Sequence, residues 1–324
     1  MIKRRYIAFF TVILCLSFLI CQSNRAFSTD SALTPEELID KHLRSIGSPE
    51  TLSAIKSRGI SGKAGVEFLL GATGKIPVGN FMYVSEGSKT GLQMVFDDIN
   101  YPGEYFAFDD NEVSVGYMSP GQRSPLADFI FRHYPIMKEG LLGGVLSSAW
   151  PLLNIEKNRP RMKLTESVIE ERRLYELEYG IPGNRPGFMK ISLFFDMKNF
   201  RHVRTEYSVR MADDLTAARR ILTGEDLSLS KAMDRANDSF FIAGEPGQMT
   251  QKPTIMDSLA DSKYLMVEKF DEFADVGGVV LPLSYSIDYS LEGQGVTFLG
   301  KWEIRAEFLT NNGDVDQSFF KAQK

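Results

Sequence analysis

The strongest constraint on the fold is an alternation of period two in the stretch Gly277–Phe320. From Val296 to Phe308 every second residue is apolar or small, and the residues between them are mostly charged. The run from Leu281 to Tyr289 alternates in the same way. Because successive side chains of a strand point to opposite faces, both runs predict long antiparallel strands with one buried face. Whatever covers that apolar face decides whether it can bind a ligand.

The same alternation recurs along most of the chain, in runs separated by turn residues. It predicts a mainly antiparallel β fold with some α: a curved, incomplete barrel of about ten or eleven strands wrapped over helices. Besides the two strands above, the expected strands are Gly59–Leu69, Gly79–Glu86, Lys89–Phe96, Glu104–Asp109, Glu112–Met118, Lys163–Glu170, Arg172–Gly180, Phe188–Asp196, Arg201–Met211 and Tyr264–Phe273.

Helical patterns open the chain and interrupt the strands. Thr34 followed by Pro35 and Glu37 is typical of a helix start, Gly47 ends that helix, and a second short helix is expected over Pro49–Lys56. A helical excursion at 125–151 comprises Pro125–Gly140, broken or kinked at Pro135, and Leu141–Trp150.

An insertion at 212–262 breaks the strand pattern and is too long for an ordinary connection. Two helical pieces are expected within it, Leu215–Leu222 and Ser228–Ala236. We expect it to act either as a lid or as a mobile excursion.

Residues 1–28 have the composition of a secretory signal. Three basic residues precede the apolar run Ile7–Ile20, and small residues around Ala26 and Ser28 suit a cut near Ser28. This predicts a periplasmic protein with one domain at 29–324; the alternative is an inner-membrane anchor formed by an uncleaved signal.

Composition excludes several kinds of function. Both cysteines, Cys15 and Cys21, lie in the leader, so the exported chain would have no disulfide, thiol nucleophile or cysteine metal site. The leader also holds four of the 37 basic residues and no acidic one. The remaining 33 basic and 42 acidic residues give a net charge of −9, which disfavours nucleic-acid binding.

No catalytic or metal-binding motif is visible. The three histidines, His42, His133 and His202, lack ligand spacing and are interpreted as solvated or packing residues. The pairs Asp97-Asp98 and Asp109-Asp110, and the run Asn312–Asp316, are interpreted as turns. We therefore expect no enzyme, cofactor or metal; a hydrolase is the weakest alternative, because no nucleophile and base are seen together.

Four segments together resemble LolA-like outer-membrane lipoprotein-sorting proteins. The segments, in order, are Leu38-Ile39-Asp40-Lys41-His42-Leu43 with Ser45-Ile46-Gly47 and Leu52-Ser53-Ala54-Ile55-Lys56-Ser57; Leu193-Phe194-Phe195-Asp196 before Arg201–Glu206; Phe270-Asp271-Glu272-Phe273 with Gly277-Gly278-Val279-Val280-Leu281-Pro282; and Trp302 followed by Asn312, Val315-Asp316 and Phe319. The matches spread over Leu33–Phe320.

The resemblance implies an incomplete barrel with helices as a lid, and a concavity for the acyl chains of lipoproteins or other lipids. It also implies a lid-gating arginine, to which the sequence assigns no position. The chain departs from this family by its greater length, which lies in the 125–151 and 212–262 segments.

The apolar face is therefore the candidate site of a non-enzymatic carrier for a lipid or an acylated lipoprotein. Its expected ligand-binding residues are Tyr175, Tyr179, Tyr207, Leu283, Tyr285, Tyr289, Phe298, Trp302 and Phe308. The alternative is an envelope scaffold with a permanently sealed core, which binds a protein partner through a sheet edge or through 212–262. In either case we expect a monomer.

Overall fold

The computed structural model describes residues 33–70, 74–116, 118, 121–183, 189–210, 263–292 and 298–321. The predicted signal at 1–28 and the insertion at 212–262, with its two helical pieces, lie outside these residues. None of the helices within the described ranges is long and apolar enough to span a membrane.

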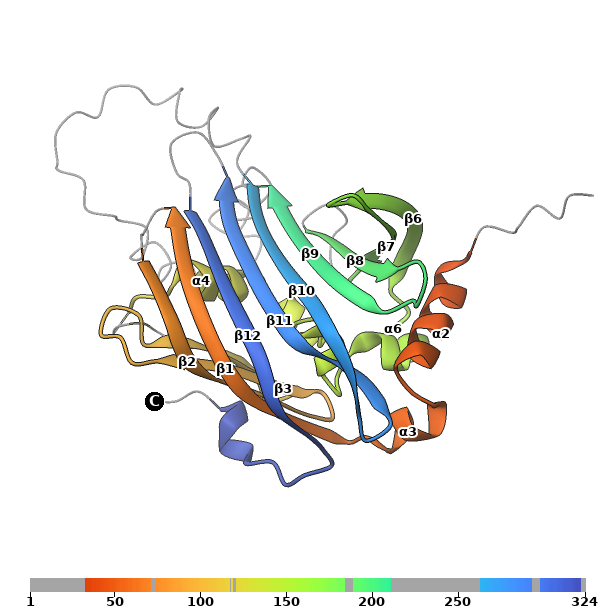
Figure 1. Ribbon diagram of the computed structural model, residues 1–324, viewed down its shortest axis with the longest axis horizontal. Helices are drawn as coiled ribbons and strands as arrows, with labels where there is room; N and C mark the ends of the chain where they lie inside the picture. The colour runs from red at the N-terminus through yellow and green to blue at the C-terminus, as the bar shows by residue number, and fades with distance from the viewer. Residues whose placement is uncertain are drawn as a thin grey trace, which may run out of the picture. The chain divides into compact units, whose positions relative to one another are not determined.

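The described residues form one antiparallel sheet of twelve strands, so the predicted fold class is confirmed (Figure 1). The expected strands all occur, with bounds shifted by a few residues. The strands are β1 (Ser57–Leu70), β2 (Gly74–Glu86), β3 (Lys89–Phe96), β4 (Gly103–Phe108), β5 (Val113–Val115), β6 (Arg161–Ile169), β7 (Arg172–Gly180), β8 (Lys190–Asp196), β9 (His202–Arg210), β10 (Lys263–Val276), β11 (Val279–Glu292) and β12 (Phe298–Asn311).

The order across the sheet is β5-β4-β3-β2-β1-β12-β11-β10-β9-β8-β7-β6. Two runs of neighbouring strands are thus joined where β1 pairs with β12. Strands β5 and β6 follow each other in the chain but form the opposite edges of the sheet. The connection between them must therefore cross the width of the sheet, and this connection holds the helical excursion.

The helices at the start of the chain agree with the prediction. Helix α2 (Pro35–Ile46) stops one residue before Gly47 and buries Leu38, Ile39 and Ile46. In the next turn the Ser48 hydroxyl accepts a hydrogen bond from the Thr51 N–H at 3.2 Å and caps α3 (Pro49–Ala54).

The excursion between β5 and β6 is less helical than predicted. Helix α4 (Pro125–Arg132) ends before Pro135, as expected, and α5 (Pro135–Lys138) follows. The helix predicted over Leu141–Trp150 is wrong: this part contains only the 3-10 turn η1 (Gly144–Leu146). Gly140, Gly143 and Gly144 adopt positive φ angles of 73°, 81° and 49°, which no α-helix accommodates. The remaining elements are η2 (Pro151–Asn154), α6 (Ile155–Asn158) and η3 (Gln317–Phe320).

Candidate functional site

The concave face of the sheet carries most of the predicted ligand-binding residues. Tyr179, Tyr207, Tyr285, Tyr289 and Trp302 are all buried there. Tyr175, Leu283 and Phe298 are half-buried. Tyr175 stacks on Phe200 at 6.1 Å between ring centroids, and Phe298 lies 6.0 Å from Tyr289.

Phe308 does not belong to this face, and its inclusion is corrected here. Its side chain is 69% exposed. On β1, Gly62 pairs with Ala306 and Ser61 pairs with Phe308, so Glu307 is an extra residue that forms a bulge. Because a bulge shifts the alternation by one position, Phe308 points to the outer face.

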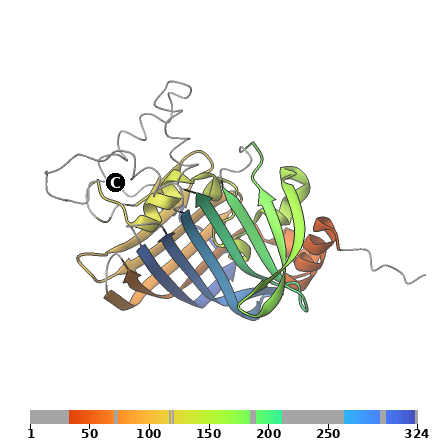
Figure 2. The ribbon, with the colours of Figure 1, turned by 90° about the horizontal axis from the view of Figure 1, so that it is seen from above.

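The residues Pro125–Asn158, which we call the plug, cover the concave face. Figure 2 shows their helices on the inner side of the curved sheet. The ring of Phe129 lies 5.4 Å from Tyr289, and Trp150 lies 4.9 Å from His202. The buried hydrophobic residues of the plug are Leu126, Ala127, Phe129, Ile130, Ile136, Met137, Leu141, Leu142, Val145, Leu146, Trp150 and Leu152.

Glu268 is the polar centre of the contact between the plug and the concave face of the sheet, which we call the wall. Its side chain, on β10, is fully buried. The Gly143 N–H donates to Oε1 at 2.7 Å and the Tyr285 hydroxyl donates to the same oxygen at 2.6 Å, while the Tyr207 hydroxyl donates to Oε2 at 2.7 Å. Burial raises the pKa of Glu268 to about 7, although the three hydrogen bonds oppose the shift.

Arg58 makes a second set of contacts to the plug. Its guanidinium is buried, and Nη1 donates to the carbonyls of Val145 at 2.8 Å and Leu146 at 3.3 Å. Its Nε donates to Asn311 Oδ1 at 2.9 Å, which ties the contact to the end of β12. Burial lowers the pKa of Arg58 to about 10, so the side chain stays charged at neutral pH.

Strand β2 provides two further polar contacts to the plug. The Tyr83 hydroxyl donates to the Leu142 carbonyl at 3.0 Å. The Ser85 hydroxyl oxygen accepts from the Ser148 N–H at 2.8 Å and lies 2.9 Å from the Ser148 hydroxyl. With Glu268 and Arg58, these groups hold the backbone of residues 142–148 against three parts of the wall.

A second buried carboxyl lies where the plug begins. Glu104 Oε1 accepts a hydrogen bond from the Tyr101 hydroxyl at 2.6 Å, and that hydroxyl accepts one from Trp302 Nε1 at 2.6 Å. Burial raises the pKa of Glu104 to about 7, against hydrogen bonds with Ser124 and Tyr101. Ser124 is the N-cap of α4. This carboxyl therefore connects the wall to the first helix of the plug.

All three histidines are buried, and two of them lie near each other. The ring centroids of His42 and His202 are 6.3 Å apart. His42 Nδ1 lies 3.0 Å from the Phe200 carbonyl, and His202 Nε2 lies 2.8 Å from Thr205 Oγ1. Burial lowers the pKa of His42 to about 4, so it is neutral at pH 7. His42 and His202 are packing residues between α2, the plug and the wall.

One small cavity lies beside the plug within the described residues. The cavity, between α3, the plug and the wall, has a volume of about 10 Å³ and is lined by Ile46, Leu52, Ile55, Arg58, Val145, Ser148, Trp150, Leu153 and Val279. Such a volume suits at most one water molecule. An acyl chain could reach these wall residues only if the plug moved.

The acidic turns agree with their sequence interpretation. Asp98 Oδ1 accepts from the Asn100 and Tyr101 N–H groups, and Asp109 Oδ1 accepts from the Asn111 and Glu112 N–H groups. No group of three or more His, Cys, Asp or Glu in the described ranges is arranged to hold a metal ion.

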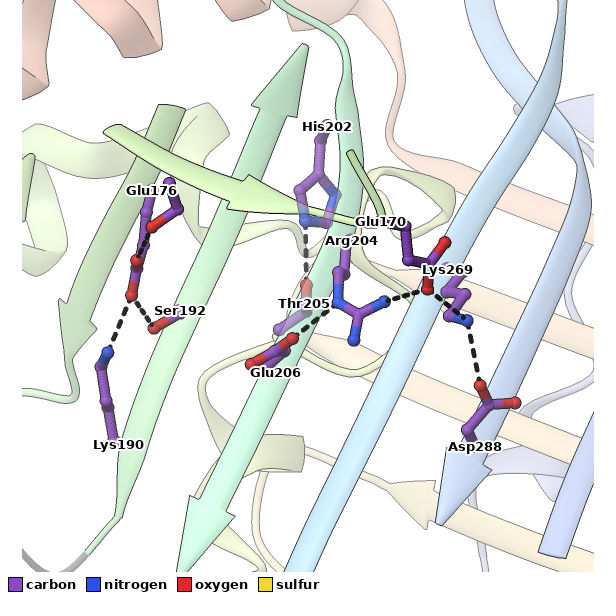
Figure 3. Close-up of polar contacts among 11 residues, drawn as sticks. Glu170, Glu176, Lys190, Ser192, His202, Arg204, Thr205, Glu206, Lys269 and Asp288 are labelled. Carbon is purple, nitrogen blue, oxygen red and sulfur yellow. Dashed lines mark hydrogen bonds and ion pairs between the residues drawn. The ribbon is translucent and has the colours of Figure 1, made fainter. Parts of the chain in front are cut away.

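The outer face of β7 to β11 is charged and internally paired (Figure 3). Arg204 contacts Glu206 at 2.7 Å and Glu170 at 3.6 Å, and Lys269 contacts Glu170 at 3.4 Å and Asp288 at 3.2 Å. Beside them, Glu176 accepts from Lys190 and Ser192 at 2.8 Å each. These contacts explain the alternating charges of the strands but form no site.

Of the known proteins compared with this chain, only solved structures match it. No family model matches the sequence, and no curated protein matches it. A LolA superfamily protein from Nitrosomonas europaea matches with 12% identity and a TM-score of 0.41, over 90% of this chain and 98% of the other. A domain from Vibrio parahaemolyticus described as outer membrane lipoprotein-sorting matches with 8% identity and a TM-score of 0.35, over 88% and 95%.

A third solved structure that matches is MucB of Pseudomonas aeruginosa in complex with MucA. It matches with 9% identity and a TM-score of 0.20, over 86% of this chain and 100% of the other. LolA superfamily proteins, which the sequence resembles, are thus among the structures found. These identities and TM-scores assign no function to this chain.

The sequence prediction missed the residues that hold the plug. Glu268 gives a signal in hindsight, because it stands on the apolar side of its strand, between Met266 and Phe270. Arg58 is likewise a charged residue on the inner side of β1, next to Ile60. Neither stands in a recognisable motif.

Proposed function

We propose that this protein is an exported, non-enzymatic carrier that binds an acyl chain of a lipid or a lipid-modified protein on its concave face. The ligand would take the place of the plug, which covers the wall in the closed state. The observation that carries this proposal is the set of polar contacts between the wall and the backbone of the plug. The polar wall groups, Glu268 and Arg58 among them, bond to the plug backbone, so they hold a segment that is not a strand of the sheet.

An acyl chain would bury its methylenes against the wall in place of the apolar side chains of the plug, so ligand and plug would compete for the same apolar surface. Arg58 also fits the lid-gating arginine that the sequence resemblance implies, since it donates to two plug carbonyls.

The test is extraction of lipid from protein purified out of the cell envelope. We expect mass spectrometry of a gentle organic extract to find acyl lipid in stoichiometric amount, and a fluorescent fatty acid to bind the delipidated protein. If the extract holds no lipid and the fatty acid does not bind, the proposal is wrong.

A second candidate is an envelope scaffold with a permanently sealed core. The burial of the plug's apolar side chains favours it, because they cover the concave face. On this hypothesis the plug is a fixed part of the core, and a protein partner would bind at a surface such as the edge strand β6. Absence of lipid, together with a partner that co-purifies at a fixed ratio, would support it.

A further inference from the structure

The outer face of the sheet carries ion pairs over β7 to β11 and also along β12, where Lys301 pairs with Glu303. Small and apolar side chains gather near the C-terminal end of β12 and the start of β1. There Ser61 on β1 lies between Phe308 on β12 and Met82 on β2. Two residues earlier on β1, Gly59 lies between Thr310 on β12 and Val84 on β2. Phe308 and Met82 are 69% and 42% exposed.

This part of the outer face is hollowed into a groove of about 240 Å³. Its floor and one side come from the sheet, and the other side is the chain after β12. The lining residues are Gly59, Met82, Val84, Thr310, Gly313, Asp314, Val315, Asp316 and Phe319.

The C-terminal side of the groove is held in place by hydrogen bonds and packing. The Ser57 hydroxyl donates to the Gly313 carbonyl at 3.0 Å, and the Tyr105 hydroxyl donates to the Phe319 carbonyl at 2.8 Å. The ring of Phe319 packs over Gly91, where a Cβ atom would come within 2.7 Å of it. The groove is therefore part of the folded structure.

The two acids at the groove are exposed and have no basic partner within the part of the chain that the structure describes. Asp314 makes no ion pair there, and Asp316 uses its carboxylate to accept a hydrogen bond from the Ser318 N–H at 2.9 Å. Elsewhere on the outer face, by contrast, Glu170 and Asp288 are paired with Lys269. The groove thus combines an apolar floor with unpaired negative charge.

We propose that this groove binds an extended peptide segment of a partner protein, with a large apolar side chain followed two residues later by Lys or Arg. The volume is below the ~300 Å³ at which small-molecule pockets begin, and suits one or two side chains. Residues two apart on an extended chain point the same way and lie about 6.6 Å apart. The apolar side chain would lie over Gly59 and Val84, and the basic one beside Asp314. This site is separate from the concave face and does not depend on the proposed function.

The test uses methyl NMR of the exported protein labelled at its methionine methyl groups. Met82 reports on the groove, whereas the buried Met137 of the plug and Met266 of the wall report on the concave face. The probe is acetyl-Thr-Phe-Thr-Lys-Thr-amide, and its matched control carries Glu in place of Lys. We expect the Lys peptide to shift the Met82 signal and leave Met137 and Met266 unchanged, and the Glu peptide to bind about fivefold more weakly or less.

Substitutions at the groove test where the peptide binds. Asp314→Lys should weaken the Lys peptide about fivefold, whereas Asp97→Lys, the same charge change at an exposed acid beyond β3, should not. Gly59→Leu should abolish binding by filling the floor; its Cβ would lie 3.2 Å from the hydroxyl of Thr310, which can rotate.

Three results would overturn the proposal: no Met82 shift at several millimolar peptide, equal shifts by both peptides, or a Met82 shift caused by myristate but not by peptide. Failure of the carrier function would be visible separately, as unchanged Met137 and Met266 signals with myristate.

Discussion

The backbone N–H of Gly143 donates a 2.7 Å hydrogen bond to the buried carboxyl of Glu268, which follows it by 125 residues. This contact joins the middle of the plug to the centre of the concave wall. The same carboxyl accepts from Tyr207 and Tyr285, so one side chain satisfies three buried donors.

Replacement of Glu268 by Ala should destabilise the protein strongly. The variant leaves the Gly143 N–H and two tyrosine hydroxyls without an acceptor, and each unsatisfied buried group costs about 1–3 kcal/mol. We expect the free energy of unfolding in urea to fall by about 3 kcal/mol or more. Glu178→Ala, at an exposed position of β7, is the matched control and should change it by less than about 0.5 kcal/mol. Similar losses for both variants would contradict the role of Glu268.

The contribution of Glu268 to stability should depend on pH. Its pKa is about 7 in the folded protein against an ordinary value of 4.5, so the folded state binds the proton more tightly. This contribution is complete below about pH 4.5 and is lost as the pH rises through about 7. The buried His42 has a lowered pKa and acts in the opposite sense: its contribution is present above pH 6.5 and is lost as the pH falls through about 4.

A comparison of wild type with Glu268→Gln isolates the carboxyl from the histidines. The difference in unfolding free energy, wild type minus variant, should decrease between pH 4.5 and 7 and then level off. Glu104→Gln should behave in the same way, because burial also raises the pKa of Glu104 to about 7. A difference that does not vary with pH would contradict the assigned burial of these carboxyls.

Gly144 should not tolerate a side chain. It has φ +49°, and a Cβ atom would lie 2.8 Å from the Phe270 ring and 2.9 Å from His202. Gly144→Ala should therefore cost about 2–3 kcal/mol, of which the left-handed backbone accounts for ~1 kcal/mol. Gly87→Ala is the control: its φ is +61° but nothing lies within 4 Å, so only the backbone cost is expected. Equal melting temperatures for the two variants would show that the plug does not pack closely on the wall.

Arg58 should slow the opening of the plug. In Arg58→Leu the carbonyls of Val145 and Leu146 lose their donor, so the backbone amides of residues 143–148 should exchange hydrogen faster. Hydrogen exchange of the β10 and β11 amides should change much less. Glu170→Ala, which removes only exposed ion pairs, should leave exchange in the plug unaltered. Uniform acceleration over the whole sheet would instead indicate general destabilisation.

Local patterns predicted the sheet because they are a direct consequence of strand geometry. The alternation in Leu281–Tyr289 and in Val203–Met211 identifies the inner and outer faces without knowledge of the neighbouring strands. The sequence did not predict the outward direction of Phe308. The bulge at Glu307 is defined only by the pairing of β12 with β1, in which Ser61 pairs with Phe308 and Gly62 with Ala306. A bulge depends on the pairing of two strands far apart in the chain.

The candidate site was less predictable than the sheet. Tyr207 and Tyr285 were expected to line an apolar space, but both hydroxyls bond to Glu268. The partner of that carboxyl in the plug is a backbone N–H, which carries no residue-specific signal in the sequence. The composition of Leu141–Trp150 suggested a helix, whereas the contacts of Leu142, Val145 and Ser148 with the wall favour an irregular course.

The central claim, that a ligand replaces the plug, is tested most directly by a reversible cross-link between the two. The hydroxyl oxygens of Ser85 and Ser148 lie 2.9 Å apart, so cysteines at these two positions would have their sulfur atoms near each other. The variant Ser85→Cys, Ser148→Cys is made with Cys15→Ala and Cys21→Ala, so that only the new pair can form a disulfide; the same chain with Ser148→Cys alone is the control. We predict that the oxidised double variant binds a fluorescent fatty acid at least tenfold more weakly than the reduced one, while the control is unaffected by the reductant. Equal binding by the oxidised and reduced forms, or none by either, would contradict the claim.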